Sequence, residues 1–317
     1  MKDLKVIFMG TPEFAVPILE ALIENTNVIM VVTQPDKEVG RHHELEASPV
    51  KKVALKNNIK VYQPTKIRKE YEEIVNAKPD LIITCAYGQI IPEEILNAPD
   101  LGCINVHASL LPKLRGGAPI HHAIIDGLDK TGITIMYMDK NMDTGDIITK
   151  EECPILESDN VGTLLDKLSL LGRDLLIRTL PSIVIGSNPR TPQNEAEATF
   201  AWNITREEEH IDFNKTAKEV YDKVRGLYPW PKAYTIIDGN EVKILECFIG
   251  DKESSLSAGT ICEINKDNIG ICTRDKVIYI TKVKPFGKKE MSCLDYVNGL
   301  SKEKVIYTTV KWKNTNY

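Results

Sequence analysis

Hydrophobic positions in the first half of the chain form short unbroken runs, separated by segments with helical spacing. Five runs have the length and apolar content of buried strands: residues 5–10, 28–33, 81–86, 102–107 and 133–138. Continuous apolar strands are typical of parallel sheets that are covered on both faces. Between the first two runs, Phe14, Ile18 and Leu22 share one helical face. The pattern predicts an α/β domain with a doubly wound, mostly parallel sheet.

The turn after the first strand, Gly10-Thr11-Pro12-Glu13-Phe14, carries the signals of a helix start. Thr11 can cap a helix, Pro12 fits the first helical position, and Glu13 suits the positive helix end. We therefore expect a helix to begin here. The turn lacks the GxGxxG pattern, and Pro12 and Glu13 would crowd and repel a pyrophosphate, which disfavours a dinucleotide-binding enzyme.

The pattern changes after a long helical region at about residues 161–185. Residues 186–194 are rich in turn-forming side chains and indicate a linker. A short helix over 216–225 is then followed by closely spaced segments with strand character: 233–237, 241–248, 258–264, 270–273 and 276–283. Such spacing predicts a small antiparallel β domain, most simply a barrel. We expect a first domain, a linker and a second domain over residues 1–188, 189–206 and 207–317.

Composition fits a soluble globular protein of this size. The 317 residues are 42% hydrophobic and 27% charged, with a formal net charge of −5. The absence of an apolar run of roughly 18 residues argues against a transmembrane helix, and the first residues do not resemble a signal peptide. Seven scattered cysteines without a CxxC pair argue against a disulfide framework or a zinc site and fit a reducing cytosol.

The densest group of candidate catalytic residues is Asn105-Val106-His107-Ala108-Ser109. Asn105 and His107 are two residues apart on a predicted strand, so they face the same side. They lie at its carboxyl end, where open α/β sheets place their ligands. An amide can stabilise a developing oxyanion, and an imidazole can move a proton near neutral pH, which suits acyl transfer. The alternative is that both are satisfied structural residues at a strand end.

Asp139, Asp143 and Asp146 lie together in a segment rich in Asp and Gly. Three acids in a loop could bind a divalent cation, but the calcium-loop pattern is absent. One carboxylate could instead support a nearby imidazole. A solvated turn explains the same residues without any function.

Two further segments are candidate binding surfaces. Residues 34–46 are long for a strand-to-helix connection, and long loops on rigid scaffolds are often functional. In the acidic chain, residues 282–313 hold eight lysines against three acidic residues. This excess fits a phosphate-backbone contact on a β-barrel, and a solvated surface is the alternative.

Several motifs together resemble the methionyl-tRNA formyltransferase family, over nearly the whole chain. The first domain matches at Phe8–Ala15, Thr33–Asp36 with Gly40-Arg41, Ser48–Lys51, Ala86–Pro92, Gly102–Pro119, Gly132–Thr134 and Met142–Ile147. The second matches at Ile211–Phe213, Val224-Arg225, Pro229–Pro231 and Lys284–Lys289. The Asn-x-His-x-Ser-Leu-Leu-Pro run and the later Asp-x-Gly are typical of formyltetrahydrofolate-dependent enzymes. The opening Gly-Thr-Pro-Glu-Phe and the second domain narrow the likeness to the tRNA enzymes.

The resemblance implies a Rossmann-type formyltransferase domain and an oligonucleotide-binding (OB)-like barrel that contacts tRNA. The implied activity moves the formyl group of 10-formyltetrahydrofolate to the α-amine of methionine on initiator tRNA. The implied catalytic residues are Asn105, His107 and Asp143. The folate pocket would be lined by Ser109, Leu110, Leu111 and Pro112, and by the backbone of Gln89, Ile90 and Ile91. Arg41 would reach the acceptor end of the tRNA, and Lys282, Lys284, Lys288 and Lys289 belong to the basic surface.

The same resemblance implies a cytoplasmic monomer that needs no metal. This chain departs from the family where residues 42–44 read His-His-Glu in place of Gly followed by lysines. It departs again at Ala201-Trp202-Asn203, where a Lys is common near the start of the second domain. Both changes bear on tRNA contact and not on the chemistry. Rival interpretations are a formyltransferase acting on an amino-sugar nucleotide, a formyltetrahydrofolate hydrolase, and a non-catalytic homologue that binds tRNA or folate.

Overall fold

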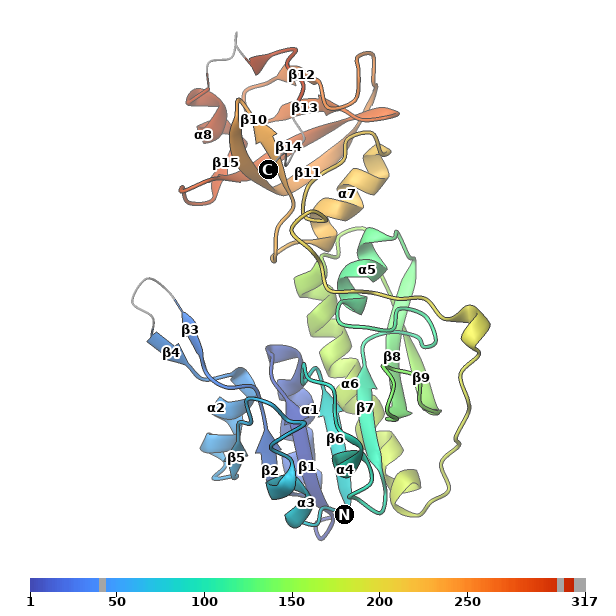
Figure 1. The fold of residues 1–317 in the computed structure, drawn as a ribbon. Coiled ribbons are helices and arrows are strands. Elements are labelled where there is room, and N and C mark those ends of the chain that lie inside the picture. The colour runs from blue at the N-terminus through green and yellow to red at the C-terminus, as the bar shows by residue number, and fades with distance from the viewer. Residues whose placement is uncertain (40–43, 301–304, 311–317) are drawn as a thin grey trace. The chain divides into compact units, whose positions relative to one another are not determined.

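The computed structural model describes residues 1–39, 44–300 and 305–310 (Figure 1). By their internal contacts the residues group into two compact units. Unit 1 comprises residues 1–119, 130–154 and 165–202, and unit 2 comprises residues 120–129, 155–164 and 203–317. This grouping interleaves the middle of the chain, whereas the sequence predicts contiguous domains. The linear boundaries at 188 and 206 remain a prediction.

Unit 1 is built on a seven-stranded sheet in the order β5-β2-β1-β6-β7-β8-β9. Its strands are β1 (Lys5–Gly10), β2 (Asn27–Val32), β5 (Val61–Tyr62), β6 (Leu81–Cys85), β7 (Cys103–His107), β8 (Lys130–Tyr137) and β9 (Ile147–Pro154). The pairs from β5 to β7 are parallel, and β8 and β9 join as antiparallel strands. The predicted mostly parallel sheet is therefore confirmed.

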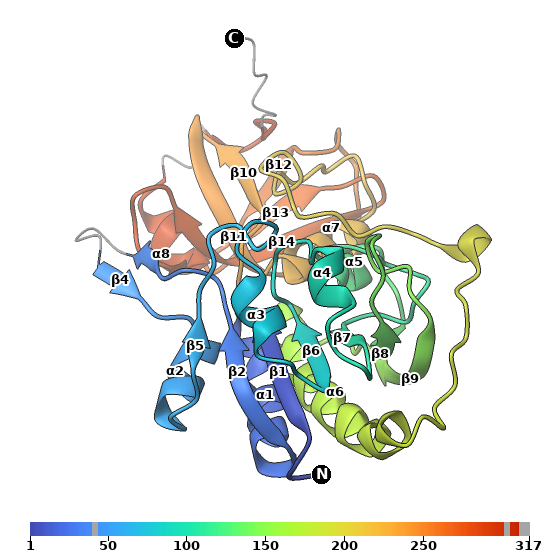
Figure 2. The ribbon, with the colours of Figure 1, turned by 60° about the horizontal axis from the view of Figure 1, so that its bottom comes forward.

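Helices cover both faces of this sheet (Figure 2). They are α1 (Val16–Asn25), α2 (Pro49–Lys56), α3 (Glu72–Asn76), α4 (Glu93–Leu96) and the part of α6 (Val161–Val184) that belongs to unit 1. The short helix α5 (Pro119–Ile125) belongs almost wholly to unit 2. On one face, Ile7 and Ile82 pack in one cluster with Ile74 of α3 and Ile95 of α4. On the other, Gly172 of α6 approaches Val106, Ile133 and Ile18 of α1.

The start of the first helix differs from the prediction. A 3₁₀ turn, η1 (Glu13–Ala15), precedes α1, whose N-cap is Ala15 without a side-chain hydrogen bond. Thr11 does not cap a helix: its hydroxyl donates to the Tyr87 carbonyl at 3.2 Å. Pro17, rather than Pro12, occupies the first turn of α1, where proline is favoured because the N–H it lacks would have no partner within the helix.

Residues 34–46, predicted as a loop, include two short strands. β3 (Lys37–Val39) pairs antiparallel with β4 (Glu44–Glu46), with Lys37 opposite Glu46. Opposite charges on directly paired residues stabilise such a ladder. Residues 40–43 between the strands, with Arg41, lie outside the described residues.

Unit 2 contains a curled antiparallel sheet in the order β10-β11-β14-β13-β12, with β15 paired to β14. Its elements are α7 (Ala217–Gly226), β10 (Tyr234–Ile237), β11 (Asn240–Glu253), β12 (Ile261–Ile264), β13 (Ile269–Cys272), β14 (Lys276–Pro285), β15 (Met291–Ser292) and α8 (Cys293–Asn298). Ile244, Ile278 and Val283 belong to its core, together with Val220 and Val224 of α7. The curled sheet agrees with the predicted small barrel-like domain.

Candidate active site

The carboxyl end of β7 carries Asn105, which is half-buried beside Thr84 of β6. The Thr84 hydroxyl donates a hydrogen bond to Asn105 Oδ1 at 3.0 Å. Because the two polar atoms of an amide diverge, this bond directs Nδ2 away from Thr84. Asn105 is therefore held as a donor at the end of the strand.

His107 lies two residues further along β7 and is 6% exposed. Its Nε2 is 3.0 Å from the Leu114 carbonyl oxygen, which fixes the ring. Its Nδ1 is 3.7 Å from Asp143 Oδ1, close enough for charge attraction and longer than a direct hydrogen bond. An amide and an imidazole on β7 thus lie near a carboxylate from the segment between β8 and β9, up to 38 positions away in the chain.

Asp143 has a φ of 56°, a left-handed backbone conformation that residues other than Gly adopt rarely. The Gly116 N–H donates to Asp143 Oδ2 at 2.8 Å and leaves Oδ1 toward the imidazole. Gln193 Nε2 donates to the Asp143 carbonyl at 2.8 Å and to the Gly145 carbonyl at 2.9 Å. These bonds stabilise the unusual backbone and fix the carboxylate.

Arg115 and Gln193 form a support that the sequence analysis did not single out as functional. Arg115 is 1% exposed, and its guanidinium donates to Gln193 Oε1 and to both carboxylate oxygens of Glu195. These bonds hold the pKa of Glu195 below its ordinary value. The signal available was an arginine within the Arg-Gly-Gly-Ala-Pro motif, but the chain gives no hint that Gln193 is its partner.

The predicted folate-lining segment 109–112 is tied down by hydrogen bonds. Thr134 Oγ1 donates to the Ser109 carbonyl at 2.6 Å and accepts from the Leu111 N–H at 3.1 Å. The side chains of Ser109 and Leu111 are fully buried, whereas Leu110 and Pro112 are partly exposed. A ligand at this segment would meet backbone atoms and the latter two side chains.

The second predicted folate segment is fixed in a similar way. The Gln89 side chain accepts from the Ile67 N–H at 3.0 Å and donates to Gln34 Oε1 at 3.1 Å, so the protein itself uses the amide. Ile91 is buried, and Ile90 is 62% exposed. The backbone of this segment, as the resemblance implies, is the part left for a ligand.

The predicted basic residues of β14 and the following turn belong to unit 2. Lys282 forms an ion pair with Glu246 across the ladder at 3.3 Å, and Lys284 is half-buried. Lys288 and Lys289 are exposed in the turn between β14 and β15. Only the latter two present their charge fully to solvent.

The three acidic residues before β9 have different partners. Asp139 accepts hydrogen bonds from the Asn141 N–H and from Thr144 Oγ1, and Asp146 forms an ion pair with Arg190. Asp143 alone turns toward the imidazole. Within the ranges 1–39, 44–300 and 305–310 there is no group of three or more His, Cys, Asp or Glu side chains placed to hold a metal ion.

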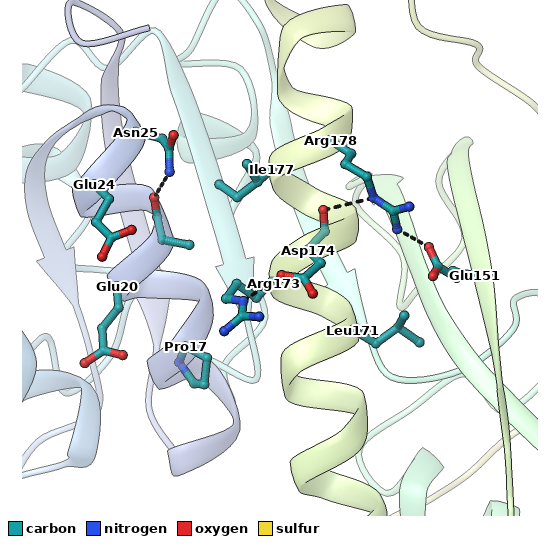
Figure 3. Close-up of a pocket in the computed structure, with 11 residues that line it drawn as sticks. Pro17, Glu20, Glu24, Asn25, Glu151, Leu171, Arg173, Asp174, Ile177 and Arg178 are labelled. Atoms are coloured by element: carbon teal, nitrogen blue, oxygen red, sulfur yellow. Dashed lines mark hydrogen bonds and ion pairs between the residues drawn. The ribbon is translucent and has the colours of Figure 1, made fainter.

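A hollow of about 680 Å³ lies elsewhere on unit 1, between α1, α6 and β9 (Figure 3). Its walls carry the ion pairs Arg173–Asp174 and Arg178–Glu151. None of the predicted site residues lines it, and it offers neither an imidazole nor a thiol. We therefore place the candidate chemistry at the end of β7.

Comparison with known proteins agrees with this placement. The formyl transferase family model matches residues 4–180, and the model of the formyl transferase C-terminal domain matches residues 203–301. A methionyl-tRNA formyltransferase of Staphylococcus epidermidis is 51% identical over 304 residues, covering 95% of this chain and 98% of that protein.

Solved structures share the fold at lower identity. The N-formyltransferase from Helicobacter canadensis in complex with folinic acid and dTDP-3-aminofucose gives a TM-score of 0.67 at 20% identity, covering 89% of this chain and 100% of that one. HypX from Aquifex aeolicus in complex with tetrahydrofolic acid gives 0.63 at 16% identity, covering 98% and 51%. Among the described residues, no helix is long and apolar enough to cross a membrane. The chain belongs to the formyl transferase family and, within it, to the methionyl-tRNA formyltransferases.

Proposed function

We propose that the protein transfers the formyl group of 10-formyltetrahydrofolate to the α-amine of methionine on initiator tRNA. The observation that carries the choice of acceptor is the 51% identity to a methionyl-tRNA formyltransferase over 95% of the chain. The arrangement of Asn105, His107 and Asp143 supports the chemistry.

The reaction exchanges one C–N bond for another. The neutral α-amine attacks the formyl carbon, the new N–C bond forms, and the bond from that carbon to N10 of the folate breaks. The amine loses a proton, and N10 gains one. The formyl oxygen carries negative charge between these events, so the protein must stabilise that charge and move a proton.

Each residue of the trio has a role that its surroundings favour. Asn105 donates its Nδ2–H to the formyl oxygen, because Thr84 occupies the other end of the amide. His107, when protonated, assists that oxygen through its positive charge, since Nε2 faces the Leu114 carbonyl and Nδ1 faces Asp143, which stabilises the imidazolium across 3.7 Å. Asp143 also organises the amine or a water for proton transfer.

Residues 109–112 and 89–91 are the proposed folate contacts. Their backbones are fixed by Thr134 and by the Gln34–Gln89 pair, so a rigid surface is ready for a planar ligand. The transfer involves no change of oxidation state and needs only proton movement, so we propose no metal for it.

The proposed tRNA contacts are Arg41, which lies outside the described residues, and Lys282, Lys284, Lys288 and Lys289. We also propose a catalytic domain over 1–188, a linker over 189–206 and a tRNA-binding domain over 207–317. The family resemblance supports a cytoplasmic monomer.

The deciding experiment measures formyl transfer from 10-formyltetrahydrofolate to methionyl initiator tRNA, methionyl elongator tRNA and an amino-sugar nucleotide. We expect rapid transfer to the initiator tRNA only. Turnover on the sugar, or release of formate without transfer, would show that the core was interpreted correctly and the acceptor wrongly. Binding of tRNA or folate without turnover would leave a non-catalytic homologue.

Variants of the trio test the assigned roles. Asn105→Ala and Asp143→Ala should each lower kcat by roughly 100- to 1,000-fold, the usual effect of losing one such group. Leu170→Ala serves as the control, because Leu170 is 47% exposed on α6 and belongs to no proposed site. Turnover near the wild-type rate in either trio variant, with the folate KM unchanged, would remove that residue from the mechanism.

A further inference from the structure

Two aromatic side chains stack on each other at the end of unit 1. The rings of Phe200 and Trp202 are 5.2 Å apart between centroids and inclined by only 2°. They remain 49% and 59% exposed. Since a stacked ring loses one face to its partner, exposure near one half indicates that a large part of the outer surface of each ring is open to solvent. Large aromatic surfaces exposed as a group are characteristic of binding sites.

Backbone hydrogen bonds join this pair to the catalytic loop. The Arg115 N–H donates to the Thr199 carbonyl at 2.9 Å, and the Ala201 N–H donates to the Arg115 carbonyl at 2.7 Å. The Ala118 N–H donates to the Ala201 carbonyl at 3.0 Å. Residues 199–201 therefore lie beside the loop that contains Gly116, the donor to Asp143.

The approach is close enough to require glycine at position 116. A Cβ there would lie 2.6 Å from the Ala201 carbonyl oxygen, and the φ of Gly116 is 123°. Standard bond lengths along this path put the Cα of Trp202 within roughly 12 Å of the Asp143 carboxylate. The aromatic pair is thus a fixed neighbour of the proposed reaction centre.

The charges around the pair favour a ring over a phosphate. Glu195 is 69% exposed and paired with Arg115, and Glu197 is exposed as well. Carboxylates disfavour a phosphate beside them and do not act against an uncharged base. The methionyl ester of a tRNA is attached to the terminal ribose, and the base of that nucleotide lies on the order of 10 Å from the amine. A base near the 3′ end is therefore the aromatic group that the reaction brings within reach.

We propose that Phe200 and Trp202 form a stacking platform for an unpaired base at the 3′ end of the acceptor strand. The proposal rests on the proposed function and adds a contact that the family motifs do not supply. Stacking on an aromatic side chain tolerates any base, so the platform contributes affinity for the acceptor end and not the choice of initiator tRNA.

The kinetic test compares Trp202→Ala, Phe200→Ala and Trp202→Leu with the wild type. Trp202→Leu keeps an apolar side chain and loses the aromatic face, whereas Trp202→Phe keeps a face and serves as the conservative variant. We expect the first three to raise the KM for methionyl initiator tRNA by about 5- to 100-fold, the usual effect of removing one stacking residue. The KM for 10-formyltetrahydrofolate and kcat at saturating tRNA should stay within about twofold, and Trp202→Phe should remain near the wild type.

The binding test uses uncharged initiator tRNA with an abasic nucleotide at the terminal or the preceding 3′ position. In the wild type, one of these changes should weaken binding by about the factor seen with Trp202→Ala. Abasic tRNA tested with the Trp202→Ala variant should bind little more weakly than either change alone allows, because both changes remove the same contact. With Trp230→Phe and Trp312→Phe, Trp202 is the single tryptophan, and its fluorescence should be quenched by intact tRNA and not by the abasic form.

Three results would overturn the proposal. The first is a double variant Phe200→Ala/Trp202→Ala whose tRNA KM equals that of the wild type, when the wild-type protein itself formylates tRNA. The second is a raised KM for the folate alone, which would assign the platform to the folate ring. The third is additivity between the abasic tRNA and Trp202→Ala. If the wild type itself formylates no tRNA, the proposed function fails and the platform proposal falls with it.

Discussion

Asp143 is held in place by hydrogen bonds from other parts of the chain. Its left-handed φ of 56° is accompanied by hydrogen bonds from Gln193 to the carbonyls of Asp143 and Gly145. Gln193 is in turn fixed by the buried guanidinium of Arg115. The position of the proposed catalytic carboxylate therefore depends on a side chain 50 residues away in the chain.

Gln193→Ala should lower both activity and stability. Two carbonyls lose their donor, at a cost of about 1–3 kcal/mol in the free energy of unfolding. We expect kcat to fall by about 10- to 100-fold, since small displacements of catalytic groups are costly. Formyl-transfer kinetics and urea denaturation measure the two effects.

Gln193→Glu separates the effect on activity from the effect on stability, because it keeps the acceptor for Arg115 and removes the N–H donors. It should lose activity like the alanine variant and lose less stability. Asn194→Ala is the neighbouring control, since Asn194 caps only the short turn η2 (Glu195–Glu197). Wild-type kcat in both Gln193 variants would show that Asp143 needs no such support.

At the scale of elements, the β3–β4 hairpin is anchored at its base. The Asp36 carboxylate accepts from Lys51 Nζ at 2.6 Å and from Gln63 Nε2 at 2.8 Å. Gln63 also donates to the Gln34 carbonyl at 2.9 Å. These contacts connect the start of the hairpin to α2 and to the residue after β5, so they fix the direction in which the hairpin leaves the sheet.

Asp36→Ala should raise the KM for methionyl initiator tRNA by about 3- to 30-fold and leave the folate KM unchanged, because it loosens the strands that precede and follow residues 40–43, which include the proposed tRNA contact Arg41. Hydrogen bonds from Lys51 and Gln63 hold the pKa of Asp36 below its ordinary value. The anchor is therefore complete above the ordinary carboxyl pKa and is lost only as the pH falls through the lowered value. The ratio of variant to wild-type KM should consequently be the same at pH 6 and pH 8.

Glu46→Ala is the comparison for this variant. It removes the Lys52–Glu46 ion pair, whose side chains are 56% and 54% exposed, and the cross-strand pair of Lys37 with Glu46, but it leaves the Asp36 anchor intact. Exposed pairs of this kind contribute little. Removal of a negative charge by itself favours a polyanion, so a tRNA KM raised as much by Glu46→Ala as by Asp36→Ala would mean that the Asp36 anchor has no special role.

At the scale of the whole molecule, the chain must attract a polyanion although its net charge is −5. Local concentration of positive charge resolves this conflict, because screening limits surface charges to a range of about 8 Å at physiological salt. Lys288 and Lys289 are exposed, whereas Lys282 is partly neutralised by Glu246. Of the four predicted lysines, Lys288 and Lys289 are thus the stronger candidates for phosphate contact.

Lys288→Ala/Lys289→Ala should weaken tRNA binding and flatten its salt dependence. Each lost phosphate contact lowers the slope of log K against log salt by about 1, so a reduction of about 2 is expected. Titrations between low and physiological salt measure it. Lys60→Ala/Lys130→Ala removes the same charge from positions paired with Glu73 and Glu152, and it should leave the slope unchanged. Equal slopes in the two double variants would reject a specific phosphate contact.

Strands and long helices followed closely from local pattern. The strand at 5–10 and the helix at 161–184 lie where the periodicity predicts them, because burial on both sheet faces and on one helix stripe dictates residue type. The start of the first helix could not be predicted from the local pattern, since the Thr11 hydroxyl donates to the carbonyl of Tyr87, 76 residues away. Likewise, the short strands β3 and β4 depend on each other and on an anchor outside the segment.

The sequence by itself determined the α/β and β organisation of the chain, its family, and the residues Asn105, His107 and Asp143 as candidates. Local spacing and recognisable motifs contain that information. Only the tertiary structure decided how Asp143 lies against the imidazole, how Arg115 and Gln193 support it, and that Phe200 and Trp202 lie beside the loop containing Gly116. These relations join residues distant in the chain through directional hydrogen bonds and close backbone approach, and the fold must form before such contacts exist.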